Sequence, residues 1–214
     1  MAPYALAADE SCRKVKIGSM DITAHESLTW KYILNQLISG QDLGSRHVDW
    51  AMDEIMTGST PEPILASFLT SLHMKGETSE ELGALARGML AKAETIDLDV
   101  HAVDIVGTGG DQQNTVNIST MAALVIAGTG ATVVKHGNRA STSKSGSADV
   151  LEALGIQLDM PIKSVAACAR QVGITFLFAM TFHPSMRFVG PTRKILGIPT
   201  AFNYLGPMTN PARV

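Results

Sequence analysis

Three clusters of small, hydroxyl-bearing and basic residues carry the clearest chemical signal in this sequence. The first is the glycine-rich run Gly-Thr-Gly-Gly-Asp at 107–111, the second is Lys-His-Gly-Asn-Arg at 135–139, and the third is the Ser- and Thr-rich run 141–149. Glycines allow a backbone to approach a ligand closely with its N–H groups pointing inward, and cations and hydroxyls bind phosphate oxygens. A tight turn or a polar loop would explain any one cluster, but together the three predict a site for a polyanionic, phosphorylated ligand.

A fourth polar run, Asn117 to Thr120, opens a predicted helix soon after the glycine-rich run. Ser and Thr are common simple caps at this position. They also bring hydroxyls, free N–H groups and the positive end of a helix to one point, which suits phosphate. Gln112 stands where a dinucleotide-binding GxGxxG run needs its third glycine, and no GxxxxGK[ST] run is present.

The sequence contains no pattern for covalent catalysis. There is no GxSxG and no evident nucleophile–base triad, and His136 has no second His or Cys at metal-ligand spacing. His183-Pro184 reads as a turn or helix start. We therefore expect chemistry that depends on positioning and electrostatics, for which phosphoribosyl transfer is a suitable reaction.

Alternating strands and helices must position these clusters. Short β-branched and apolar runs at 103–106, 132–134 and 174–178 alternate with helical patterns, which lie at 119–127, 147–154 and 162–172. This alternation predicts an α/β fold with a mainly parallel sheet. The polar clusters follow the strands, and ligands of such sheets bind beyond the carboxyl ends of the strands.

The first hundred residues predict a small bundle of four helices. The first helical apolar stripe runs over 27–39, and the second begins at a cap, Ser45, and ends at Gly58. The third begins at a cap, Thr60, with Pro61 as its first helical residue, and ends at Gly76. The fourth begins at Thr78. Thr78 and Glu81 have the spacing of a capping box. We expect a helical domain at 1–98 and an α/β domain at 99–214 that includes a helical segment near 184–197.

Composition sets limits on the class of protein. The chain has 214 residues, 45% hydrophobic and 17% charged, with a net charge of −3, which excludes disorder over most of its length and disfavours general nucleic-acid binding. Residues 160–214 contain six basic and no acidic residues, which fits either a solvated face or an anion site. No apolar run reaches the roughly 18–20 residues of a membrane span, and no secretory signal is evident. Two isolated cysteines, Cys12 and Cys168, favour the reducing cytoplasm.

Long segments of the sequence resemble the anthranilate phosphoribosyltransferase family. They are DIVGTGGDQQNTVNIST, VVKHGNRASTSKSGSADVLEALG, FHPSMRFVGPTRKILGIPTAFNYLGPMTNPA and the helical GSTPEPILASFLTSLHMKGETSEE. The likeness runs from about residue 28 to the last residue. It implies a homodimer that joins anthranilate to 5-phosphoribosyl-1-pyrophosphate (PRPP) with magnesium in tryptophan biosynthesis, on a small helical domain and a larger α/β domain.

The resemblance also implies roles for individual residues. Anthranilate would contact Gly107, Asn138, Arg193 and Pro207, with the arginine pairing with its carboxylate. Ser119 would also bind magnesium. PRPP would be bound by Gly107, Gly110, Asp111, Thr115, Asn117, Ile118, Ser119, Thr120, Lys135, His136, Gly137, Asn138, Arg139, Ala140, Ser141, Thr142, Ser143 and Ser147.

Two departures from the family pattern leave alternative functions open. The segment 112–116 differs from many members, and members continue for more than a hundred residues past the position of Asn210-Pro211, where they supply an acidic pair for magnesium. We therefore expect a chain that lacks the C-terminal third, and a catalytically incomplete module that binds PRPP or only dimerises is the alternative. A pyrimidine nucleoside phosphorylase is disfavoured, because the segment after Lys135 lacks that family's glycine-rich pattern.

Overall fold

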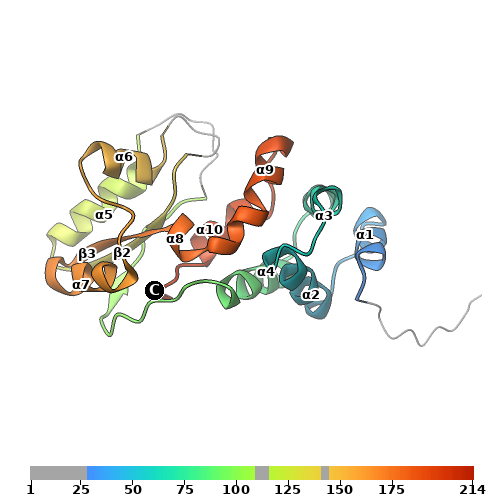
Figure 1. The fold of residues 1–214 in the computed structure, drawn as a ribbon, viewed down its shortest axis with the longest axis horizontal. Helices are drawn as coiled ribbons and strands as arrows, with labels where there is room; N and C mark the ends of the chain where they lie inside the picture. Colours follow the sequence, from blue (N-terminus) through green and yellow to red (C-terminus); the bar gives the residue numbers. More distant parts are fainter. Residues whose placement is uncertain (1–27, 109–115, 141–144) are drawn as a thin grey trace, which may run out of the picture.

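A computed structural model of the chain describes residues 28–108, 116–140 and 145–214. It places a helical body at one end and an α/β body at the other, as Figure 1 shows. Helices from the C-terminal part of the chain lie between the two. The predicted class, a helical domain followed by a parallel α/β domain, is confirmed.

Among the residues that the structure describes, four helices form the helical body. They are α1 (Trp30–Ile38), α2 (Ser45–Met56), α3 (Glu62–Lys75) and α4 (Ser79–Ala91). Two predicted helix starts are wrong by one residue. Gly44 and not Ser45 is the N-cap of α2, and Pro61 and not Thr60 is the N-cap of α3, because the carbonyls of Gly44 and Pro61 accept the first helical N–H bonds.

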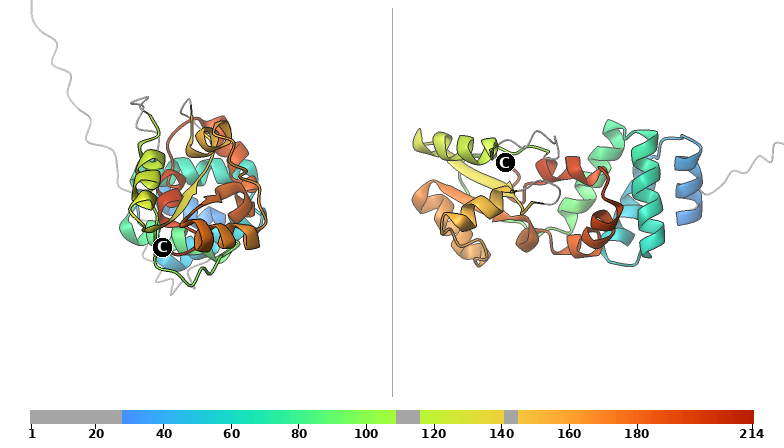
Figure 2. Two further views of the ribbon diagram at one scale, coloured as in Figure 1. Left: turned by 90° about the vertical axis from the view of Figure 1, so that its left-hand side faces the viewer. Right: turned by 90° about the horizontal axis from the view of Figure 1, so that it is seen from above.

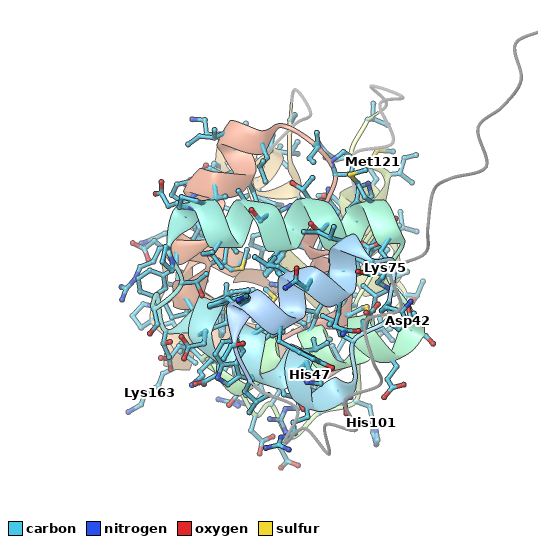
Figure 3. All side chains as sticks on the ribbon, turned by 90° about the vertical axis from the view of Figure 1, so that its right-hand side faces the viewer. Asp42, His47, Lys75, His101, Met121 and Lys163 are labelled. Carbon is cyan, nitrogen blue, oxygen red and sulfur yellow. The ribbon has the colours of Figure 1, made fainter. Side chains whose placement is uncertain are left out.

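The predicted capping box of α4 is present and belongs to a larger buried network. Glu81 is fully buried, and its Oε2 accepts from the Thr78 N–H at 2.9 Å and from Lys75 Nζ at 2.8 Å. Its Oε1 accepts from the Leu43 N–H at 2.8 Å. Lys75 also pairs with Asp42, which lies beside it in Figure 3. One carboxylate thus connects α3, α4 and the α1–α2 loop.

In the described residues, the α/β body is built on a parallel sheet of three strands in the order β1-β2-β3. Its strands are β1 (Ala102–Val103), β2 (Thr132–Gly137) and β3 (Ile174–Phe178), and its helices are α5 (Ile118–Gly128), α6 (Ser147–Ala153) and α7 (Ile162–Val172). Leu177 packs with α7, whereas Phe176 and Phe178 pack with α6. Because neighbouring residues of a strand face opposite ways, α6 and α7 cover opposite faces of β3 (Figure 2).

Strand β1 is shorter than the predicted 103–106, because side chains replace its backbone beyond Val103. The His136 N–H donates to Asp104 Oδ1 at 3.2 Å, and Asn210 Nδ2 donates to the Val134 carbonyl at 3.0 Å. Asn210 Nδ2 also donates to Asp104 Oδ2 at 2.8 Å. The polar side chains thereby take the positions that a longer ladder would use.

The C-terminal part of the chain returns to the helical body. It contains α8 (Ala179–Phe182), a 3-10 helix η1 (Pro184–Phe188), α9 (Gly190–Leu196) and α10 (Phe202–Met208). Val189, Phe202 and Leu205 join the same hydrophobic core as α1–α4. None of the helices in the described ranges is both long and apolar enough to span a membrane.

Candidate anion and carboxylate site

The buried ammonium of Lys135 marks the centre of the predicted anion site. Lys135 lies near the carboxyl end of β2 and is 4% exposed. Its Nζ donates to the Ile105 carbonyl, after β1, at 2.7 Å and to Ser119 Oγ, in the first turn of α5, at 3.3 Å. The predicted convergence of two strand ends and one helix start is therefore present at this lysine.

The charge of Lys135 has no direct counter-ion among the described residues. Burial lowers the pKa of Lys135, and the nearby carboxylate of Asp104 opposes that shift without forming an ion pair. Burial likewise raises the pKa of Asp104, against the hydrogen bonds from Asn210 and from the His136 N–H. A buried and unpaired ammonium is costly, so an anionic ligand next to Nζ would be stabilising.

The loop after β2 is held against the start of α6 by backbone hydrogen bonds. Asp149 Oδ2 accepts from the N–H groups of Ala140 at 2.9 Å and Gly146 at 2.7 Å, and these two bonds lower the pKa of Asp149. The Asn138 carbonyl accepts from the Ala148 N–H at 3.2 Å. The backbone of residues 138–140 is therefore fixed beside the end of β2.

Gly146 is required by this close approach of two backbone segments. A Cβ at this position would lie 2.5 Å from the Ala140 nitrogen and 2.7 Å from the Asn138 oxygen. We expect Gly146→Ala to lower the free energy of unfolding by about 1–3 kcal/mol and to weaken pyrophosphate binding. Equilibrium unfolding and calorimetric titration measure both. Gly128→Ala, where a Cβ meets nothing within 4 Å, is the control; equal results for the two variants would refute the steric argument.

Arg139 faces α6. Its Nε donates to Glu152 Oε2 at 3.1 Å, and its guanidinium carbon lies 4.8 Å from the centre of the Phe178 ring. The side chain is exposed. The predicted contact of Arg139 with PRPP stays a prediction, and in this arrangement its side chain is engaged by α6.

Two buried histidines, His136 and His183, lie with ring centres 5.1 Å apart. His136 Nδ1 bonds to the Gly206 carbonyl at 3.1 Å, and His183 Nε2 bonds to the Thr209 carbonyl at 3.0 Å. Burial lowers the pKa of each to about 4, so both are neutral at pH 7. Each neutral ring must donate to its carbonyl, and together they tie β2 and η1 to the α10 segment.

Arg193 is a second cation without a carboxylate partner in the described parts of the chain. It lies on α9, half-buried, and its Nη2 donates to Asn203 Oδ1 at 3.2 Å. Burial lowers the pKa of Arg193, although a guanidinium remains charged at any physiological pH. The arrangement suits a ligand carboxylate, which arginine binds with two parallel hydrogen bonds.

The structure places the remaining predicted residues around these cations. Asn117 Nδ2 donates to Ser145 Oγ at 3.4 Å, which joins the α5 start to the third cluster. Ile118 exposes 62% of its surface, and Thr120 is buried. Pro207 lies inside α10, directly after Gly206. The predicted residues Gly110, Asp111, Thr115, Ser141, Thr142 and Ser143 lie outside the described residues.

Sequence reasoning missed four residues that organise this region: Asp104, His183, Asn203 and Asn210. Asp104 and Asn210 are 106 positions apart, so no local pattern connects them. Asn203 had a weak local signal, because it follows Thr200 at the three-residue spacing of a helix cap.

The oxygen donors at the site are compatible with magnesium. Ser119 offers a hard hydroxyl oxygen beside Lys135. The described residues contain no group of three or more His, Cys, Asp or Glu that could hold a metal ion by themselves. Mg²⁺ commonly takes few protein ligands and completes its shell with substrate phosphates and water, so a single hydroxyl fits an ion that arrives with a pyrophosphate.

Comparison with known families matches both bodies. A glycosyl transferase family model for the helical bundle domain matches residues 31–93, and one for the a/b domain matches residues 99–214. The chain is 59% identical over 186 residues to the anthranilate phosphoribosyltransferase of Arthrobacter sp. (strain FB24), covering 87% of this chain and 53% of that protein. It spans about half the length of the curated relatives that it matches.

Solved structures of the same kind of enzyme are also similar to this chain. The anthranilate phosphoribosyltransferase of Thermus thermophilus matches with a TM-score of 0.79 and 44% identity, covering 84% of this chain and 55% of that one. The Saccharomyces cerevisiae enzyme in complex with PRPP and Mg matches with a TM-score of 0.79 and 34% identity, covering 88% and 57%. The yeast enzyme in complex with 4-fluoroanthranilate matches with a TM-score of 0.72 and 30% identity, covering 87% and 55%.

Proposed function

Because this chain belongs to the glycosyl transferase family whose helical-bundle and a/b-domain models match it, we propose that the protein acts as an anthranilate phosphoribosyltransferase. It transfers the phosphoribosyl group of PRPP to the amine of anthranilate, giving N-(5-phosphoribosyl)anthranilate and pyrophosphate, a step of tryptophan biosynthesis. The observation that carries this proposal is the pair of cations Lys135 and Arg193, neither paired with a described carboxylate. One suits a pyrophosphate and the other an aromatic acid.

The reaction needs charge stabilisation more than it needs a covalent catalyst. Substitution at the anomeric carbon gives the sugar cationic character while negative charge grows on the departing pyrophosphate. Lys135 and the N–H groups at the start of α5 stabilise that charge where it develops. The aromatic amine is neutral at pH 7, so positioning it against the ribose is the main remaining contribution.

Magnesium would be held by Ser119 together with the pyrophosphate oxygens, and it would neutralise part of their charge. Lys135, which donates to the same hydroxyl, keeps that oxygen beside the anion. The metal preference is supported by the PRPP and Mg complex of the yeast relative.

Partners and compartment follow from the same proposal. The protein forms a homodimer through its N-terminal helices, which is supported by large apolar side chains exposed there, Ile38 at 73% and Met74 at 83%. It binds no nucleic acid and no membrane, and it works in the cytoplasm, as its net acidity and its two isolated cysteines favour.

The test is the loss of anthranilate fluorescence when PRPP and magnesium are mixed with the 214-residue chain. We expect a loss that depends on PRPP and is abolished by Lys135→Met. A chain that binds pyrophosphate by calorimetry but consumes no anthranilate would favour the alternative, a catalytically incomplete PRPP-binding module. Pyrophosphate binding that is unchanged in Lys135→Met would contradict the site itself.

A further inference from the structure

We infer that Asn203 is a positioning residue that holds the Arg193 guanidinium in place and leaves its positive charge free for the carboxylate of the aromatic substrate. The inference rests on the proposed function, because it concerns the acceptor half of that site. According to this inference, the neutral amide of Asn203 makes the site prefer an aromatic compound with a carboxylate over an uncharged one.

The carboxamide of Asn203 is fixed by its own backbone neighbourhood. The Thr200 N–H donates to Asn203 Oδ1 at 3.1 Å, and the Asn203 N–H donates to the Thr200 carbonyl at 2.9 Å. These reciprocal bonds hold the side chain at the start of α10. Both groups that face Oδ1, the Thr200 N–H and the Arg193 guanidinium, are donors, so the amide must present its oxygen to them.

The same oxygen anchors Arg193. Its Nη2 lies 3.2 Å from Asn203 Oδ1, and its guanidinium carbon lies 5.7 Å from the centre of the Phe202 ring. Neither contact carries negative charge. An aspartate at position 203 would accept the same two hydrogen bonds but would neutralise the guanidinium inside the protein, so the choice of amide over carboxylate has a consequence for any anionic ligand.

Helix α10 links this anchor to the anion site. Asn203 lies near the start of α10, and Gly206, one turn later, accepts a hydrogen bond from His136, the residue next to Lys135. The position of Arg193 relative to the end of β2 is thus set through a single seven-residue helix. We therefore expect Asn203 to affect the aromatic acid and to leave pyrophosphate binding unchanged.

The experiment compares Asn203→Asp, Asn203→Ala and the wild-type chain in titrations with anthranilate, with its uncharged analogue anthranilamide, and with pyrophosphate. Asn35→Asp, an exposed amide on α1, controls for the added charge. We expect Asn203→Asp to weaken anthranilate binding at least tenfold, to leave anthranilamide and pyrophosphate within twofold of wild type, and to unfold at the same or a higher denaturant concentration. Asn203→Ala should lose stability and weaken anthranilate less than the aspartate does.

A merely structural role predicts the opposite order, with the aspartate at or above wild type for every ligand and the alanine below it. That order, or an Asn203→Asp chain less stable than Asn203→Ala, overturns the inference while leaving the proposed function in place. A folded wild-type chain that binds pyrophosphate but neither aromatic compound overturns the proposed acceptor, and the inference with it.

Discussion

Arg193→Ala is expected to weaken anthranilate binding by about 2–5 kcal/mol, which is tens- to thousands-fold in Kd. The substitution removes a half-buried cation that has no described carboxylate partner, so the ligand carboxylate would enter the site without a counter-charge. Pyrophosphate binding should change little, because Lys135 and the start of α5 supply that part of the site. Titration calorimetry with each ligand measures both effects.

Lys194→Ala is the matched control, because it removes the same charge from the next residue of α9, where the side chain is exposed. We expect wild-type affinity for both ligands in this variant. Equal losses of anthranilate and pyrophosphate affinity in Arg193→Ala would contradict the role assigned to the arginine, as would an equal loss in the control.

Glu81→Gln should lower the free energy of unfolding by about 3–5 kcal/mol, a large share of the roughly 5–15 kcal/mol that holds a typical domain folded. Three donors converge on this buried carboxylate: Lys75 Nζ, the Leu43 N–H and the Thr78 N–H. An amide keeps one acceptor oxygen and presents an NH₂ group to the others. It thereby removes the buried carboxylate partner of the Lys75 ammonium, which keeps only its ion pair with the exposed Asp42.

Chemical denaturation followed by circular dichroism measures this loss, and Glu80→Gln, an exposed neighbour on the same helix, is the control. Its effect should remain within about 0.5 kcal/mol of wild type. If the two variants unfold at the same denaturant concentration, the buried network does not hold α3, α4 and the α1–α2 loop together.

Local patterns predicted the elements well, because caps and periodicity act over a few residues. The capping box of Thr78 and Glu81 is one example, and the position of Lys135 near the carboxyl end of β2 is another. The sequence did not reveal which of these polar side chains form hydrogen bonds with residues far away in the chain. The hydrogen bond from the Leu43 N–H to the buried Glu81 joins residues 38 positions apart, and the bond from Asn210 to Asp104 joins residues 106 positions apart.

The length of β1 shows the same limit. The apolar run at 103–106 looks like a strand, but the ladder ends at Val103 because Asp104 and Asn210 bond to the backbone of β2. The site residues show the same limit. Lys135 was predicted as a site residue because it belongs to a local motif, whereas a role for Asn203 follows only from its hydrogen bond with Arg193 in the structure.

The return of Val189, Phe202 and Leu205 to the core of α1–α4 has a consequence for synthesis on the ribosome. The chain emerges from its N-terminus, so the first four helices leave the exit tunnel long before the residues that complete their core. Their apolar surface stays partly uncovered while the three described strands are translated, which takes several seconds at about 5–20 residues per second. The core of the helical body therefore cannot be completed until residues 189–205 have left the ribosome, after the three described strands have been made.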